Sequence, residues 1–132
     1  MKCLKMRISL LFICGLNTYE KDVLIFSNTS FHQLKSITIG YKCFQHVREF
    51  VLDGLESLES VKIGVDCFRI GDYERNDGIC RITNCPNLRQ LKIGDESFAD
   101  FKSFEISNLN SIQSIEFGDG CIRYADLSLK GE

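Results

Sequence analysis

The sequence contains no tryptophan, only one proline, and no run rich in serine and glycine. Without such a run no linker is predicted, so we expect one ordered domain over residues 1–132. Lysine and arginine are scattered, and a formal net charge of -2 with a pI near 5.7 argues against a nucleic-acid partner. The apolar runs are too short to cross a membrane as a helix. We therefore expect neither a nucleic-acid partner nor a membrane span.

The N-terminal segment allows two interpretations. Lys2, Lys5 and Arg7 precede the apolar run ISLLFICGL, which has the charge and length of a secretory signal. However, no small-x-small cleavage site follows, and the chain continues into VLIF from Val23 much as the later repeats do. We favour a degenerate first coil over residues 1–33 and keep a signal over residues 1–16 as the alternative.

A short motif recurs four times and dominates the sequence. Its copies align without gaps: LKSITIGYKCF from Leu34, LESVKIGVDCF from Leu58, LRQLKIGDESF from Leu88 and IQSIEFGDGCI from Ile112. The motif glycines are Gly40, Gly64, Gly94 and Gly118, which lie 24, 30 and 24 residues apart. This periodicity predicts repeats at 34–57, 58–87, 88–111 and 112–132, the last of them incomplete.

Each repeat is predicted to contribute two strands. Ile37 and Ile39 alternate with polar residues, which is the period-2 pattern of a strand with one buried face. A second alternating pair, Phe50 and Leu52, follows about half a coil later, and the other repeats have its equivalents. Because β-branched residues cluster and glycine interrupts before a helical turn could propagate, little helix is expected.

The repeats are predicted to stack as a solenoid. A unit of about 24 residues cannot bury its apolar residues alone, so neighbouring coils must cover them. Stacking should place Phe44, Phe68 and Phe98 in an internal column that Ile122 ends. The glycine after each first strand is predicted to supply a turn with positive φ.

The Leu-x-x-Ile-x-Ile core from Leu34 and its three copies resembles the leucine-rich-repeat superfamily. The closest likeness is to its BspA-like and protist-type variants, whose units end in Ala-Phe or Cys-Phe, and it covers residues 31–129. The resemblance implies a mainly β, right-handed solenoid with two short parallel strands per coil. It also implies a sheet of first strands that binds a protein or glycan. The chain departs from the common pattern three places after the last strand leucine, where Asn or Cys is usual and Lys42, Asp66, Glu96 and Gly120 stand here.

Two groups of residues are candidates for partner binding. On the resemblance, the outward positions of the first strands are Ser36, Thr38, Ser60, Lys62, Gln90, Lys92, Ser114 and Glu116. They lack the Tyr, Trp and Arg that usually anchor binding hot spots. The 30-residue spacing also predicts an insertion of about six residues after Phe68, and insertions in repeat proteins often carry binding function. Its candidates are Asp72, Tyr73, Glu74 and Arg75.

The seven cysteines are an odd number without short paired spacings, which makes a poor disulfide framework. Cys43, Cys67 and Cys121 share one repeat position, where Ser97 stands in the remaining copy, and this favours a small-residue packing role. We expect reduced, buried thiols, which favours a cytoplasmic location. A secreted or cell-surface location would follow if residues 1–16 were a signal.

Motifs for catalysis or cofactor binding are weak. The strand pattern places Cys80 and Cys85 in the core ladder, away from any histidine, so no metal site is predicted. A pair of Cys43 and His46 lacks an orienting third group. We therefore expect no enzyme and no cofactor, but an interaction module for a protein or glycan. The alternative is a structural segment of a longer repeat array or surface protein, whose uncapped ends would self-associate.

Overall fold

The computed structural model describes residues 10–13, 22–69, 77–122 and 125–130. Across these residues the chain is mainly β, with one short helix, α1 (Asn28–Phe31). Its strands form two five-stranded sheets in which neighbours are parallel. The first sheet contains, in spatial order, β1 (Leu10–Ile13), β3 (Ser36–Ile39), β5 (Ser60–Ile63), β7 (Gln90–Ile93) and β9 (Ser114–Phe117). The second contains β2 (Val23–Ser27), β4 (Glu49–Asp53), β6 (Gly78–Thr83), β8 (Phe101–Ser107) and β10 (Asp126–Lys130).

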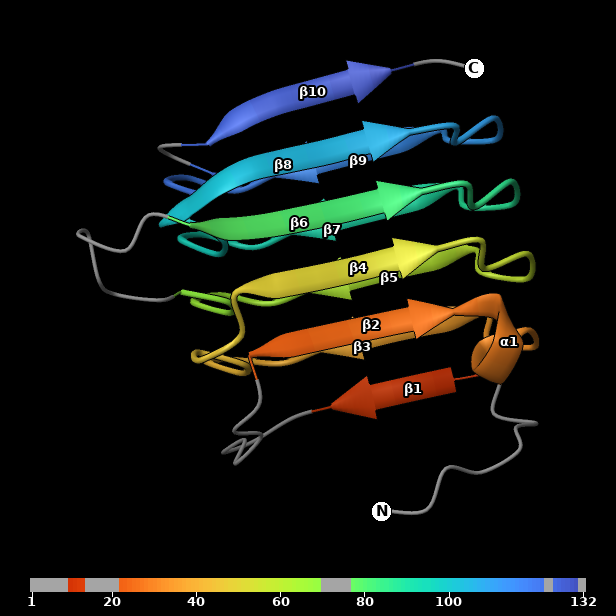
Figure 1. The fold of residues 1–132 in the computed structure, drawn as a ribbon, viewed down its shortest axis with the longest axis horizontal. Coiled ribbons are helices and arrows are strands. Elements are labelled where there is room, and N and C mark those ends of the chain that lie inside the picture. Colours follow the sequence, from red (N-terminus) through yellow and green to blue (C-terminus); the bar gives the residue numbers. More distant parts are fainter. Residues whose placement is uncertain (1–9, 14–21, 70–76, 123–124, 131–132) are drawn as a thin grey trace.

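The two sheets lie one behind the other, and the chain passes between them at corners on both sides (Figure 1). Each turn of the chain supplies one strand to each sheet, so the turns stack along one axis with β1 and β10 at opposite ends. The predicted solenoid, with about 24 residues and two parallel strands per coil, is confirmed. No helix among the described residues is long and apolar enough to span a membrane.

Inward side chains form continuous columns because the strands pair in register. Ile37, Val61 and Leu91 are consecutive partners in the first sheet, and each is at most 1% exposed. Phe50 and Cys80 are partners in the second sheet and are also buried. Full burial of a Val, Leu, Ile or Phe side chain contributes about 1.5–3 kcal/mol. These contacts run between coils, so the core is continuous along the stack.

The predicted phenylalanine column is confirmed. The rings of Phe44 and Phe68 are stacked with centroids 5.2 Å apart, and those of Phe68 and Phe98 are stacked at 4.7 Å. The Phe98 N–H bonds to the Cys67 carbonyl, and the Ile122 N–H bonds to the Ser97 carbonyl in the same way. Ile122 therefore occupies the next position of the column. Stacked rings of this kind stabilise the contact between coils by more than the burial of their apolar area alone would.

The prediction of positive φ at the motif glycines is wrong. Among the described glycines only Gly54 and Gly120 have positive φ. A Cβ added to Gly64 would lie 2.7 Å from the Gly40 carbonyl oxygen, and one added to Gly94 would lie 2.6 Å from the Gly64 carbonyl oxygen. The motif glycines are therefore needed because the backbones of successive coils approach closely at this corner.

Positive φ occurs instead two places after each motif glycine, at residues with side chains in three copies and at Gly120 in the fourth. Lys42, Asp66 and Glu96 have φ of 56°, 59° and 65°. A positive φ raises the free energy of any residue other than glycine, but here it points the backbone N–H groups toward the next coil. The Lys42 N–H bonds to the Val65 carbonyl at 3.0 Å, and the Asp66 N–H bonds to the Asp95 carbonyl at 2.9 Å. Hydrogen bonds between coils thus offset the strain at this corner.

The opposite corner carries a ladder of side-chain amides directly after the second strands. Asn84 and Asn108 have φ of 56° and 55°, and Gly54 takes the same place one coil earlier with φ 75°. The Asn108 side-chain amide donates to Asn84 Oδ1 at 2.8 Å, and the Asn84 amide donates to Asp53 Oδ1 at 2.9 Å. This ladder is not among the features predicted from the sequence.

The extra residues between Phe68 and Gly78 leave the stacking of the sheets intact. The strands on either side, β5 and β6, pair with β7 and β8, and the register shifts only between Gly78 and Ile79. Just after the insertion, Arg48 and Asp77 form an ion pair at 3.0 Å. The strands that flank residues 70–76 thus keep their places in the two sheets.

Candidate interaction face

The eight candidate residues of the first strands lie together on the outward side of the first sheet. They form two columns that cross β3, β5, β7 and β9, namely Ser36, Ser60, Gln90 and Ser114, and Thr38, Lys62, Lys92 and Glu116. We call these eight residues the first-sheet face. Lys62, Gln90, Lys92 and Glu116 are exposed, whereas the serines and Thr38 are half-buried. The outward alternation predicted from the sequence is therefore what the strands adopt. The four insertion candidates, Asp72, Tyr73, Glu74 and Arg75, lie outside the described residues.

The first-sheet face has two open hollows. One has a volume of about 210 Å³ and is lined by Lys62, Gln90, Leu91, Lys92, Ser114 and Glu116. The other, of about 450 Å³, is lined by Leu10, Lys35, Ser36, Glu59, Ser60, Arg89, Gln90 and Gln113. Small-molecule sites are usually enclosed and largely apolar, unlike these polar surfaces. The face suits contact with another surface better than enclosure of a small ligand.

Two lysines on this face are direct neighbours. Lys62 and Lys92 are register partners on β5 and β7, so their Cα atoms are roughly 4.8 Å apart. Like charges directly opposite each other destabilise a sheet. The ion pairs found among the described residues do not include Lys62, Lys92 or Glu116. These three charges are thus left to solvent or to a partner.

The second sheet handles its outward charges differently. Arg81 and Glu105 are register partners on β6 and β8, with Arg81 Nε 3.6 Å from a Glu105 carboxylate oxygen. Opposite charges therefore form an ion pair across coils on this sheet. On the first sheet Lys92 lies between Lys62 and Glu116, and no ion pair among the described residues joins these three. The two outer faces thus differ in charge arrangement although both are built on parallel strands paired between coils.

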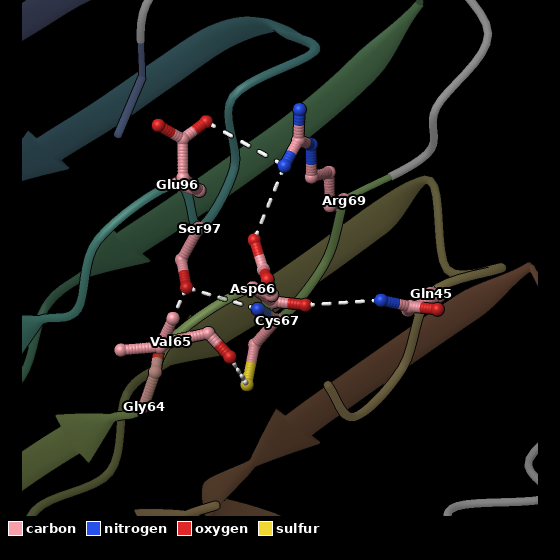
Figure 2. A network of polar contacts seen from close by, with 8 residues as sticks. All are labelled: Gln45, Gly64, Val65, Asp66, Cys67, Arg69, Glu96 and Ser97. Atoms are coloured by element: carbon pink, nitrogen blue, oxygen red, sulfur yellow. Dashed lines mark hydrogen bonds and ion pairs between the residues drawn. The ribbon is translucent and has the colours of Figure 1, made fainter. Parts of the chain in front are cut away.

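The repeat position shared by Cys43, Cys67, Ser97 and Cys121 is buried in every copy. The Ser97 hydroxyl donates to the Gly64 carbonyl at 2.6 Å and accepts from the Cys67 N–H at 3.0 Å (Figure 2). The Cys67 thiol donates to the Gly40 carbonyl at 2.6 Å. In these two copies the small side chain bonds the motif glycine of the preceding coil, whereas the Cys121 thiol donates to the Gly118 carbonyl of its own coil at 3.1 Å. The predicted packing role of this position is confirmed by its burial.

The buried thiols are poorly suited to nucleophilic chemistry. Burial raises the pKa of the Cys67 thiol to about 11 and the pKa of the Cys85 thiol to about 11. Burial also raises the pKa of the Cys80 thiol well above its ordinary value. Since the thiolate is the reactive form, these residues are neutral near pH 7. Cys43 and His46, the weak candidate pair, lie in different environments, since Cys43 is fully buried and His46 is exposed.

Charged residues at one corner hold neighbouring coils together rather than forming a reactive cluster. A single Arg69 guanidinium nitrogen lies 3.2 Å from an Asp66 carboxylate oxygen and 3.6 Å from Glu96 in the following coil (Figure 2). The Gln45 amide donates to the Asp66 carbonyl at 3.2 Å from the preceding coil. Within the described part of the chain, no group of three or more His, Cys, Asp or Glu residues could hold a metal ion.

Sequence reasoning missed surface residues beside the predicted face. Lys35, Glu59 and Arg89 immediately precede first strands and line the larger hollow. Their shared position before each strand was the available signal. On the other sheet, Val23 and Ile25 are 40% and 51% exposed, and their β-branched side chains alternate with the half-buried Leu24 and the buried Phe26 of β2.

Comparison with protein-family models, with curated proteins and with solved structures finds no match to this chain. The fold therefore follows from the repeat and the strand pairing alone.

Proposed function

We propose that this chain is a non-enzymatic interaction module of the leucine-rich-repeat type, which binds a protein or glycan through the first-sheet face. The observation that supports this proposal is the adjacent pair of Lys62 and Lys92, which forms no ion pair among the described residues although Glu116 is the register neighbour of Lys92. A partner that supplies negative charge would relieve the repulsion between the two lysines. The paired Arg81 and Glu105 of the second sheet need no such partner.

The shape and chemistry of the surface agree with recognition rather than catalysis. The first-sheet face is an open, polar surface built on four parallel strands, so its side chains are held at fixed spacings. Ser60, Gln90 and Ser114, in the neighbouring column, offer hydrogen-bond groups beside the charged positions. The fully buried Cys67 and Cys85 have raised thiol pKa values and take no part in this surface.

A pair of matched variants tests which face binds. Ser60→Glu with Ser114→Glu places two larger, negatively charged side chains on the first-sheet face, and Ser103→Glu with Ser128→Glu makes the same change on the second sheet. All four serines are half-buried and lie on strands. We expect partners captured from an extract to be lost with the first pair and retained with the second, with both proteins melting cooperatively. Equal capture by both variants would contradict the proposal.

The insertion is a second predicted contact. Removing residues 71–76 shortens the glycine spacing from 30 to 24 residues, the spacing of the other coils. If Asp72, Tyr73, Glu74 and Arg75 contribute, capture should weaken in this variant while the chain stays folded. Unchanged capture would confine binding to the sheet.

The alternative function is a structural segment that associates end to end. Leu127 and Leu129 on β10 are 43% and 59% exposed, although their register partners Phe104 and Ile106 are buried. An open strand edge with exposed apolar side chains is a template for further strand pairing. Sedimentation velocity should then show concentration-dependent association that Leu129→Lys abolishes and Ser128→Lys preserves. A monomer at all concentrations would exclude self-association of this chain.

A further inference from the structure

The charges of one column on the first-sheet face form an ordered pattern along the solenoid axis. Thr38, Lys62, Lys92 and Glu116 occupy successive coils in register, so the column is neutral, positive, positive and negative. Successive positions are roughly 4.8 Å apart. The hollow of about 210 Å³ lies over the three charged members of this column. A complementary ligand would carry negative charge at two adjacent places and positive charge beyond them.

The donors on this face indicate the chemistry of the ligand. Lysine ammonium groups only donate hydrogen bonds, so a ligand over Lys62 and Lys92 must present oxygen acceptors. Gln90 and Ser114, which line the same hollow, add neutral donors and acceptors. The two columns contain no arginine, whose planar fork is the usual choice for bidentate phosphate recognition. Carboxylate groups fit this surface best.

The surrounding charge argues against a uniformly charged polyanion. Glu116 closes the column, and Glu59 lies between Lys35 and Arg89 in the adjacent hollow. The whole chain also carries a formal net charge of -2. A sulfated glycan or a nucleic acid would place further negative charge over these glutamates. An acidic peptide with a basic residue after its carboxylates would instead match all three positions.

We infer that the first-sheet face binds an extended acidic segment of a partner protein, which runs along the solenoid axis with carboxylates over Lys62 and Lys92. The inference rests on the proposed function, because it names the ligand of the same face. Charge complementarity of this kind sets specificity and the association rate more than raw affinity. Binding should therefore be modest and should weaken as salt is raised.

Purified protein and labelled peptides test the inference by fluorescence anisotropy. The probe is a decapeptide of alternating glutamate and glycine with one lysine at its end, and its control has glutamine in place of glutamate. Lys62→Gln with Lys92→Gln is compared with Lys102→Gln and Lys130→Gln, which removes two exposed lysines from the second sheet. We expect the first-sheet variant to bind the acidic peptide about tenfold more weakly, as two lost ion pairs predict, and the second-sheet variant to bind normally. The glutamine peptide should bind weakly to all three proteins.

Three results would overturn the inference. One is failure of the intact protein to prefer the acidic peptide over its glutamine control. Another is equal weakening by the two double variants. The third is displacement of the peptide by a heparin fragment that binds more tightly and depends on the same lysines, which would assign the face to sulfated glycans. If the glutamate variants of Ser60 and Ser114 abolish partner capture while the acidic peptide shows no preference, the interaction face stands and only the ligand class is wrong.

Discussion

The Ser97 hydroxyl donates a hydrogen bond to the Gly64 carbonyl and accepts one from the Cys67 N–H, at 2.6 and 3.0 Å (Figure 2). One buried side chain therefore satisfies polar groups on the coil before it. The same repeat position is cysteine in the other three copies, with Cys67 bonding the Gly40 carbonyl. This relationship ties the two most repetitive features of the sequence, the motif glycine and the small residue after it, to one contact between coils.

Removing the Ser97 hydroxyl should destabilise the chain more than replacing it by a thiol. Ser97→Ala leaves the buried Cys67 N–H and the partly buried Gly64 carbonyl without this partner, so the free energy of unfolding should fall by about 1–3 kcal/mol. Ser97→Cys restores the residue of the other copies and should cost less. Urea denaturation measures both values. A smaller loss for alanine than for cysteine would show that the hydrogen bonds contribute little.

The motif glycines should tolerate no side chain, whereas a glycine at the other corner should. Gly94→Ala places a Cβ against the Gly64 backbone, which cannot rotate away, and should cost about 1–3 kcal/mol or more. Gly54 has positive φ with nothing within 4 Å of an added Cβ, and asparagine occupies its place in two later coils. Gly54→Asn should therefore change stability by less than about 0.5 kcal/mol. Thermal unfolding of the two variants separates steric approach from backbone conformation, and equal destabilisation would contradict the assignment.

Stability should fall at high pH because of the buried thiols. Burial raises the pKa of the Cys67 thiol from its ordinary value of 9.0 to about 11, so the unfolded chain releases this proton first. The stabilisation is thus fully present below about pH 9 and is lost as the pH rises through about 11. The urea midpoint should decline over this range, and less steeply in Cys67→Ser, which does not titrate there. Parallel declines in the two proteins would assign the effect to other groups.

The repeat allowed the strand pattern and the phenylalanine column to be predicted, because both depend only on which residues face inward. Alternation at Ile37 and Ile39 and the spacing of Phe68 and Phe98 carry that information directly. The conformation of the corners was harder to predict. Glycine is favoured either where φ is positive or where two backbones approach closely, and the spacing of Gly64 and Gly94 does not distinguish these two causes.

The amide ladder shows a signal that was present but not used. Gly54, Asn84 and Asn108 follow the second strands at equivalent positions, and glycine and asparagine are the residues that best tolerate positive φ. That shared property, rather than residue identity, would have predicted the turn. For the first-sheet face, the positions could be predicted but their charge arrangement could not. Its outward positions could be predicted from the alternation of polar and apolar residues. The importance of the neighbouring Lys62 and Lys92 could not, because it depends on the contrast with the ion pair of Arg81 and Glu105 on the other sheet.

Lysine footprinting of the bound chain tests the central claim, that the first-sheet face is the binding surface, most directly. The chain is acetylated with and without its captured partner, and the modification of each lysine is quantified by mass spectrometry. Lys62 and Lys92 should be protected in the complex, while Lys102 and Lys130 on the second sheet should react as in the free chain. Protection of Lys102 and Lys130, with Lys62 and Lys92 still fully reactive, would contradict the account.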